Sequence, residues 1–319
     1  MSQFIGRVNV ALFGLGRAGL IHFENLIASY RVALKWIIEE DVEKANNVVQ
    51  KYMLNDTRVI HGNEINLVLQ DNSIDAVIIC TPTWTHESII RASIKAGKHV
   101  FCEKPIGKSI ASTQSCYEEA QKNNKVLLCA FNRRFDPGVR QVQQKSRNGV
   151  VGQIQHIKTI SRDAPLPPLS FLKLSGGIFH DCAVHDIDVI CWIMGDTPTT
   201  VYTQGHAFNP DIADMDDIDT VAITMKFASG AIGTIDLSRF AAYGYDQRLE
   251  VFGNKGMVQN HNSKFCDMSS HGTGGESLHP ILPSFKERYA QAYQQELEHF
   301  LDTVTALLPS ELTDRAVSI

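Results

Sequence analysis

The chain has 319 residues, of which 44% are hydrophobic and 20% charged, and its formal net charge is −5 at pH 7. These values are typical of a soluble globular protein, and the length has room for two domains. The mild negative balance gives no electrostatic reason to expect nucleic-acid or membrane partners. No apolar run approaches the length of a membrane span, and the N-terminus lacks a signal-peptide core.

The cysteines are scattered along the chain and form no CxxC pair. There are seven: Cys80, Cys102, Cys116, Cys129, Cys182, Cys191 and Cys266. Most of them stand inside apolar stretches, so buried thiols in a reducing compartment are the simplest interpretation. We therefore expect a cytoplasmic protein.

Strands and helices alternate along the first 130 residues. The apolar run Val8 to Phe13 predicts a strand that feeds a glycine loop, and an amphipathic helix is expected over 20–29. Further strands are expected over 32–38, 74–80, 100–101 and 126–130, and helices over 44–52 and 87–96. This βαβ rhythm predicts an α/β domain with a doubly wound parallel sheet of the Rossmann type.

After about residue 130 the pattern changes to alternating, strand-rich segments. These are 201–203, 219–227, 231–238 and 248–252, with turn signals at Ser229-Gly230 and Gly253-Asn254. They predict a C-terminal α+β domain with a large, mostly antiparallel open sheet. We place the domains at 1–128 and 129–319, and we interpret the acidic stretch 211–219 as a solvated loop.

The glycine loop Gly14-Leu15-Gly16-Arg17-Ala18-Gly19 lies between a predicted strand and a predicted helix. Glycines permit a tight turn, and a helix N-terminus offers free N–H groups and partial positive charge to a pyrophosphate. Glu39, twenty residues beyond Gly19, completes the dinucleotide-binding fingerprint. Its carboxylate would bind both ribose hydroxyls and repel a 2′-phosphate, which favours NAD over NADP. Alternatively Glu39 only begins a charged loop, and Glu40 or Asp41 takes its place.

The segment from Gly176 to Asp188 reads Gly-Gly-Ile-Phe-His-Asp-Cys-Ala-Val-His-Asp-Ile-Asp and continues into the apolar run 189–194. It predicts a glycine turn that opens into a buried helix. On such a helix Asp181 and His185 are four residues apart and share a face. A carboxylate beside an imidazole can form a general base near neutral pH. The alternative is that His185 is an ordinary core histidine.

A metal site is a further interpretation of the same segment. His180, Asp181, His185 and Asp186 are all potential ligands. Their spacing does not give two histidines at i and i+4, so we expect no metal.

A lysine precedes a proline in Phe101-Cys102-Glu103-Lys104-Pro105, directly after a strand-like stretch. Alone, Lys104 would be read as a surface lysine. The presence of this lysine together with the glycine loop and the acid/base helix in one chain indicates a nicotinamide-dependent dehydrogenase. We expect a cis Lys104–Pro105 bond, because close placement of a functional lysine requires a tight turn.

Together with Cys80-Thr81-Pro82-Thr83-Trp84-Thr85-His86, these motifs resemble the Gfo/Idh/MocA oxidoreductase family over about residues 7–305. Within the family the chain looks most like the inositol dehydrogenases. That narrower resemblance is carried by three segments: Asn132-Arg133-Arg134-Phe135-Asp136, Ser161-Arg162-Asp163 and Tyr243-Gly244-Tyr245-Asp246-Gln247-Arg248. It implies NAD-dependent oxidation of a cyclic polyol, myo-inositol to its 2-keto product. It also implies a homodimer or homotetramer formed through sheet faces, and a longer terminal helix than the segment ending at Ile319 supplies.

The resemblance assigns roles by position. Lys104 would contact the substrate hydroxyl and the nicotinamide ribose, His185 would accept the proton, and Asp181 would complete the Lys-Asp-His site. Further cofactor contacts are implied at Thr81, Pro82, His86, Glu103 and Arg133, and further substrate contacts at Arg133, Asp163, Tyr245 and Tyr289. Asp181 would either orient the imidazole or bind a neighbouring hydroxyl. Arg133 and Arg134 could equally be surface salt-bridge partners.

Two other functions remain open. One is oxidation or reduction of another sugar, a sugar acid or a dihydrodiol, with the same Lys104 and His185 and a different lining from 161–170 and 243–248. The other is an NAD-sensing regulatory protein on the same fold. The intact set of Lys104, Asp181 and His185 argues against it, because a sensor needs no proton acceptor.

Overall fold

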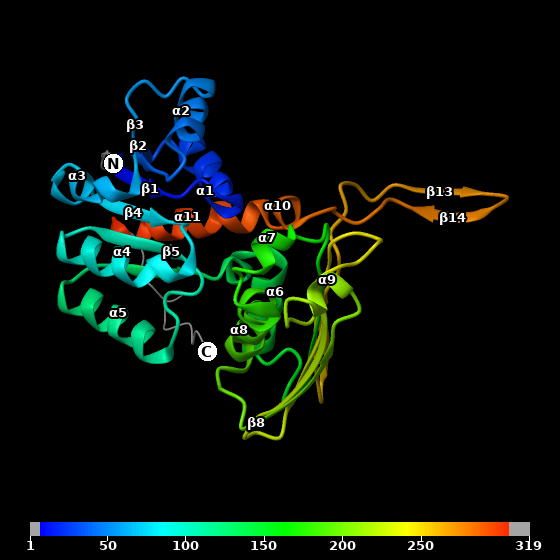
Figure 1. Ribbon diagram of the computed structural model, residues 1–319. Coiled ribbons are helices and arrows are strands. Elements are labelled where there is room, and N and C mark those ends of the chain that lie inside the picture. Colours follow the sequence, from blue (N-terminus) through cyan, green and yellow to red (C-terminus); the bar gives the residue numbers. More distant parts are fainter. Residues whose placement is uncertain (1–6, 306–319) are drawn as a thin grey trace, which may run out of the picture. The chain divides into compact units, whose positions relative to one another are not determined.

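A parallel sheet and a mixed sheet organise residues 7–305, the part of the chain that the computed structural model describes (Figure 1). Each sheet belongs to its own unit. Unit 1 comprises residues 7–132 and 293–305, and unit 2 comprises 133–292. The division at Asn132/Arg133 lies close to the predicted boundary at 128/129.

The sheet of unit 1 has the strand order β3-β2-β1-β4-β5-β6, and every pair of neighbouring strands is parallel. Its strands are β1 (Val8–Phe13), β2 (Val32–Ile38), β3 (Arg58–Ile60), β4 (Ala76–Ile79), β5 (His99–Glu103) and β6 (Leu127–Ala130). The helices are α1 (Arg17–Ala28), α2 (Val42–Lys51), α3 (Ile65–Gln70), α4 (Thr83–Lys95) and α5 (Ile110–Lys122). This strand order is that of the Rossmann fold, so the predicted doubly wound sheet is confirmed.

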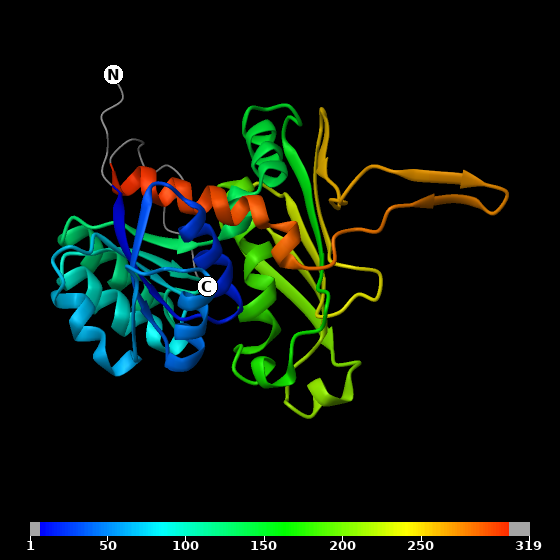
Figure 2. The same ribbon diagram turned by 90° about the horizontal axis from the view of Figure 1, so that it is seen from above.

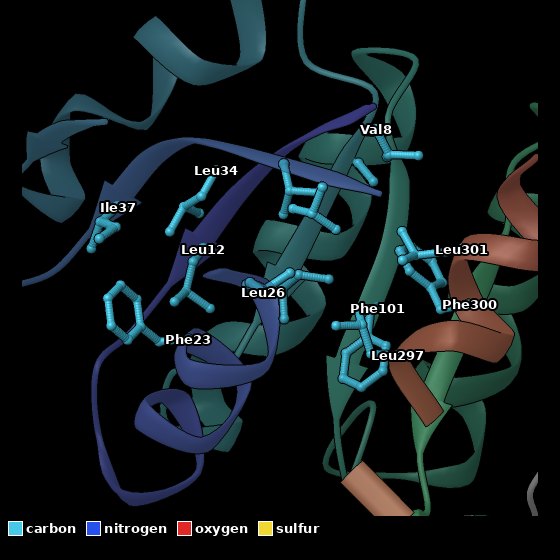
Figure 3. Packing of buried hydrophobic residues seen from close by; sticks show 14 of the residues in the cluster. Val8, Leu12, Phe23, Leu26, Leu34, Ile37, Phe101, Leu297, Phe300 and Leu301 are labelled. Carbon is cyan, nitrogen blue, oxygen red and sulfur yellow. The ribbon is translucent and has the colours of Figure 1, made fainter. Parts of the chain in front are cut away.

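Most of one helix from the end of the chain, from Tyr293 onward, belongs to unit 1. Helix α11 (Ala290–Val304) places Leu297, Phe300 and Leu301 in the same core as Phe101 of β5 and Phe23 of α1 (Figure 3). The assignment of everything after residue 128 to a second domain therefore differs from the structure. Local periodicity shows that α11 has an apolar stripe, but it does not show which sheet covers that stripe.

The sheet of unit 2 has the order β12-β11-β7-β10-β9-β8, antiparallel except between β7 and β10. Its strands are β7 (Ile154–Arg162), β8 (Thr200–His206), β9 (Thr220–Lys226), β10 (Ile232–Ser238), β11 (Asp246–Gly253) and β12 (Gly256–Asn260). The predicted mostly antiparallel sheet is confirmed. The sequence did not predict β7, the strand that joins the antiparallel pair β11·β12 to the rest of the sheet.

Helices α6 (Pro137–Arg147) and α8 (Val184–Met194) lie on one face of this sheet (Figure 2). Ile190 and Ile193 of α8 and Val142 of α6 share a core with the inward residues of β9, β10 and β11. Shorter elements of unit 2 are α7 (Leu169–Leu172), α9 (Pro210–Ala213), α10 (Phe285–Arg288) and the exposed hairpin β13 (Ser269–Gly272) with β14 (Gly275–Leu278). Buried and more exposed residues alternate along β9, β10 and β11, because only one face of each strand packs against the helices.

The interpretation of 211–219 as a solvated loop is wrong in part. Asp217 binds the buried Arg239 and also accepts a hydrogen bond from the Ile178 N–H. Asp219 is buried and accepts a hydrogen bond from the Asn209 N–H. Asp217 is thus half-buried and neutralises a buried cation, and Asp219 is itself buried with a hydrogen-bond donor.

All seven cysteines lie within the described residues, and all are free thiols. Three of them are buried, Cys102, Cys116 and Cys129, whereas Cys266 is exposed. In the part of the chain from residue 7 to 305, no helix combines the length and the apolar character of a membrane span. The terminal segment around Leu312 to Ala316 lies outside the described residues.

Glu296 on α11 carries a stability prediction. It is fully buried, and neither carboxyl oxygen has a hydrogen-bond partner among the described residues. Burial, and secondly the charge of Glu103, raises the pKa of Glu296 well above its ordinary value. The folded state therefore binds this proton more tightly than the unfolded state, and the side chain costs stability as pH rises above the unfolded pKa.

We expect Glu296→Gln to raise the melting temperature at about pH 8 and to change it little at about pH 4, where the acid is protonated in both states. Thermal unfolding followed by circular dichroism at the two pH values measures this. Glu298→Gln is the matched control on the same helix, since Glu298 pairs with Arg31 and its loss should not stabilise. A Glu296→Gln protein that melts no higher at the alkaline pH contradicts the prediction.

Candidate functional site

The glycine loop connects β1 to α1 and packs tightly against the end of β4. Gly14 has a φ of +87°, and a Cβ there would lie 2.8 Å from the Cys80 carbonyl oxygen. A Cβ on Gly19 would lie 2.1 Å from the Gly14 carbonyl oxygen, whereas one on Gly16 would meet nothing within 4 Å. The first turn of α1 has no side-chain cap and no acidic residue. The loop thus fits a pyrophosphate, which binds N–H groups at a helix N-terminus.

Glu39, directly after β2, contacts this loop. Its Oε2 accepts a hydrogen bond from the Leu15 N–H at 2.5 Å. The two alternative acids have other partners: Asp41 caps α2, and Glu40 pairs with His61 at 2.9 Å. Among the three candidates, the position of Glu39 therefore best fits the predicted ribose-binding acid.

Lys104 follows the last residue of β5, and its predicted cis bond to Pro105 is confirmed. Glu103 Oε1 accepts a hydrogen bond from His22 Nε2 at 2.8 Å, and Glu103 Oε2 accepts one from the Lys104 N–H at 3.3 Å. Burial opposes the charged form of Glu103. The hydrogen bond from His22 and the positive charges of His22, Lys104 and His86 outweigh that effect and lower the pKa of Glu103.

His86 on α4 is buried and joins two loops of unit 1. Its Nδ1 lies 2.7 Å from the Pro105 carbonyl oxygen, and its Nε2 lies 2.7 Å from the Thr81 carbonyl oxygen. Thr81 and Pro82 form the turn before α4, and the Thr81 hydroxyl bonds the Thr85 hydroxyl at 2.6 Å. Both ring nitrogens of His86 thus contact backbone carbonyl oxygens, and the cofactor contact that the resemblance implies for this residue stays a prediction.

In unit 2, Gly176 and Gly177 have φ values of +82° and +85° and form the predicted turn. The chain then makes a π-helical turn (Phe179–Ala183) before α8 begins at Val184. Asp181 lies in the π turn and His185 in the first turn of α8, and both are half-buried. The sequence predicted an uninterrupted α-helix here. The π turn is an addition of a kind that is frequent at functional sites.

Sequence reasoning did not single out Arg239, which follows β10 and contacts the candidate site residue Asp181. It is completely buried and donates to Asp181 Oδ2 at 3.2 Å and to Asp217 Oδ2 at 3.0 Å. It therefore restrains the carboxylate of Asp181. No local pattern indicated Arg239, because its two acidic partners lie 58 and 22 residues away in the chain.

Asp163, at the end of β7, lies close to Asp181. Burial and the charge of Asp181 raise the pKa of Asp163 to about 6, although the positive charges of Arg133 and Arg239 act in the opposite direction. The thiol of Cys182 lies 3.7 Å from Asp163 Oδ2 and 3.8 Å from Asp181 Oδ2. Unit 2 thus brings together two of the predicted substrate-binding carboxylates.

Arg133 is buried, which excludes the alternative of a surface ion pair. It donates to Asp186 Oδ1 at 3.0 Å and to the Ser161 hydroxyl at 3.1 Å. Arg133 also lies over the ring of Tyr289, 5.6 Å from the centroid, and Tyr289 packs edge-to-face on Tyr245 at 6.1 Å. Arg134 forms a separate buried pair with Asp188, at 2.9 and 2.6 Å.

The structure groups the predicted site residues into two sets. Unit 1 holds the glycine loop, Glu39, Thr81, Pro82, His86, Glu103 and Lys104. Unit 2 holds Arg133, Asp163, Asp181, His185, Tyr245 and Tyr289. Within residues 7–305, no three His, Cys, Asp or Glu side chains gather as a metal-binding group.

Comparisons with known proteins match both units. Residues 8–131 match the description "oxidoreductase family, NAD-binding Rossmann fold", and residues 139–259 match the "GFO/IDH/MocA C-terminal domain". A myo-inositol 2-dehydrogenase of Thermotoga maritima is 35% identical over 93% of this chain and 88% of its own length. A scyllo-inositol 2-dehydrogenase (NAD(+)) of Bacillus subtilis is 33% identical over 93% and 86%.

A solved structure is similar throughout. The scyllo-inositol dehydrogenase of Lactobacillus casei with bound NAD(H) and scyllo-inositol has a TM-score of 0.88 and 28% identity. The match covers 98% of this chain and 93% of that chain.

Asp163 gives a prediction about the electrostatics of unit 2. Because the negative charge of Asp181 raises the pKa of Asp163, Asp181→Asn should lower that pKa from about 6 towards the ordinary aspartate value. NMR titration of ¹³C-labelled aspartate carboxyls measures this, with the signal assigned by its loss in Asp163→Asn. Asp211→Asn, at an exposed position, is the control and should leave the titration unchanged. If the pKa of Asp163 is the same in Asp181→Asn as in the wild type, the two carboxylates are not close to each other.

Proposed function

The chain belongs to the Gfo/Idh/MocA oxidoreductase family, and from that premise we propose that it oxidises a cyclic polyol, myo-inositol, to the 2-keto product with NAD. It is an NAD-dependent oxidoreductase that acts on CH–OH groups. The observation that carries the proposal is the set of Lys104, Asp181 and His185 in a chain that matches inositol dehydrogenases along 93% of its length.

The cofactor half of the proposal rests on unit 1. NAD supplies the acceptor for the hydride when it is bound. The glycine loop would hold its pyrophosphate, because Gly16 faces open space and the first turn of α1 is uncapped. Glu39 would bind the ribose hydroxyls.

The chemical half rests on three side chains. Oxidation of a secondary alcohol removes a proton from oxygen and a hydride from the carbon. We propose that neutral His185 accepts the proton and that Lys104, as an ammonium, donates a hydrogen bond to the same oxygen and stabilises its negative charge. Asp181, paired with Arg239, would orient the imidazole or bind the adjacent hydroxyl.

We further propose that the protein is a cytoplasmic homo-oligomer. Only one face of the unit 2 sheet is covered by α6 and α8 (Figure 2). On the other face Ile232, Phe252 and Met257 are exposed and lie in register across β10, β7, β11 and β12, with His156 between Ile232 and Phe252. An apolar row of this kind on a sheet face supports association of like subunits. The free thiols support a reducing compartment.

Formation of NADH with myo-inositol, scyllo-inositol, hexoses and uronic acids tests the function, with NADP in parallel. Turnover of myo-inositol with NAD is expected. Turnover of another polyol or sugar in place of myo-inositol would change the proposed substrate, but the proposed roles of Lys104 and His185 would stand. Absence of turnover in both directions, with NAD still bound, would favour the sensor function.

His185→Ala tests the base. We expect turnover to fall by roughly 10²- to 10⁴-fold, the usual contribution of a positioned general base. NAD affinity, measured by calorimetry, should be nearly unchanged because the glycine loop and Glu39 lie in unit 1. An active His185→Ala enzyme would overturn the assignment.

Glu39 tests the cofactor preference. Glu39→Ala should reduce the ratio of kcat/KM for NAD to kcat/KM for NADP, since the carboxylate both binds ribose hydroxyls and repels a 2′-phosphate. Glu40→Ala is the matched control, because the Glu40 side chain is 77% exposed and pairs with His61. A ratio unchanged in Glu39→Ala, or an equal change in Glu40→Ala, counts against Glu39.

A further inference from the structure

We propose that two buried histidines of unit 1, His22 and His86, are positioning residues that hold the Glu103–Lys104–Pro105 segment and thereby the Lys104 ammonium in place. The proposal rests on the proposed function in one respect, since it takes Lys104 as the residue that acts on the substrate. Neither histidine stands in the machinery described above as a group that touches substrate. Both are 1% exposed.

His86 contacts two backbone carbonyls at once. Both ring nitrogens lie 2.7 Å from a carbonyl oxygen, one of Pro105 and one of Thr81. A carbonyl oxygen has no proton to give, so each contact requires an N–H on the ring. The ring that makes both hydrogen bonds carries two protons and a positive charge, and its charge acts favourably on the Glu103 carboxylate. A ring with one proton would hold only one of the two loops.

His22 contacts the Glu103 end of the Glu103–Lys104–Pro105 segment. It lies between the rings of Phe101 and Tyr293, with centroids 4.9 and 5.4 Å away. This packing fixes the imidazole so that Nε2 donates to Glu103 Oε1 at 2.8 Å. The second oxygen of the same carboxylate accepts from the Lys104 N–H. His22 therefore determines where the carboxylate lies, and the carboxylate restrains the backbone of Lys104.

The two histidines together restrain the peptide groups on either side of the Lys104–Pro105 bond. One acts through Glu103 on the N–H of Lys104, and the other acts directly on the carbonyl of Pro105. His86 also ties this segment to the carbonyl of Thr81, next to Cys80. Since the Cys80 N–H donates to the carbonyl oxygen of Phe13, the residue before Gly14, at 2.8 Å, a series of hydrogen bonds links the lysine segment to the glycine loop. Such a link would keep Lys104 in register with a bound nicotinamide ribose.

The charges around Glu103 are consistent with this arrangement. His22, Lys104 and His86 are the cationic groups that face it, and Glu296 of α11 is the other acid close by. Burial and the charge of Glu103 raise the pKa of Glu296 well above its ordinary value, whereas the hydrogen bond from His22 and the nearby positive charges lower the pKa of Glu103 against the effect of burial. The negative charge of the pair is therefore favoured on Glu103, the acid that faces the two histidines and the lysine.

The first measurement uses the wild-type apo protein. Two-dimensional ¹H–¹⁵N spectra of ¹⁵N-histidine-labelled protein near neutral pH report which ring nitrogens carry protons, with His86 assigned by its absence in a His86→Gln spectrum or by selective labelling. We expect both nitrogens of His86 to be protonated. A single protonated nitrogen on His86 would overturn its double contact, whatever the activity of any variant.

The second measurement separates positioning from simple destabilisation. His86→Gln, His22→Gln and Glu103→Gln should each lower kcat by roughly 10- to 100-fold, because a displacement of about 1 Å in a catalytic group has an effect of that size. NAD affinity by calorimetry should change little, and thermal unfolding shows whether each variant is folded. His99→Gln is the matched control, since His99 is a half-buried histidine at the other end of β5 that accepts from the Val126 N–H.

Lys104→Ala distinguishes this inference from the proposed function. If Lys104→Ala keeps its activity, the role of the lysine itself is wrong. If Lys104→Ala is inactive while folded His22→Gln, His86→Gln and Glu103→Gln proteins turn over like the wild type, the positioning proposal is wrong and the function stands. A loss in His99→Gln equal to theirs would also overturn the proposal, because the effect would not be specific to the segment.

Discussion

Charge buried inside each unit has to meet a counter-charge there, and this requirement determines where the functional side chains lie. In unit 1 the carboxylate is that of Glu103, and the hydrogen bond from His22 compensates its burial. In unit 2 the fully buried cation is Arg239, which Asp181 and Asp217 neutralise. A buried pair contributes little net stability, but removal of one partner is costly, so these pairs fix geometry more than they add stability.

The parallel sheet places the candidate site residues of unit 1 along one edge. Glu39, Thr81 and Lys104 follow the carboxyl ends of β2, β4 and β5, next to the glycine loop that follows β1. Ligands of open α/β sheets bind at that edge, where the strand order reverses. The loops that follow the strands are closely packed, because β4 is buried along its whole length and a Cβ on Gly14 or Gly19 would clash with backbone. The packing of the sheet therefore determines the position of the Lys104 backbone.

Local pattern predicted what local physics determines. The bounds of β1 and β2 agree with the apolar runs, since the strands of a parallel sheet covered by helices are rich in apolar residues. Composition and spacing also indicated the glycine turn before α8. What they could not predict depends on residues far apart in the chain. Arg239 lies 58 residues from Asp181, and nothing in either neighbourhood identifies the other as its partner.

The same limit applies to contacts between other segments of the chain. One ring nitrogen of His86 contacts the Pro105 carbonyl oxygen, 19 residues along the chain, and the local sequence around His86 does not predict this contact. The π turn that carries Asp181 is only 5 residues long, which is too short for a hydrophobic period to distinguish it from an α-helical turn. A motif therefore indicates candidate reacting groups. The contacts of His22 and His86 in unit 1 and of Arg239 in unit 2 follow from tertiary packing alone.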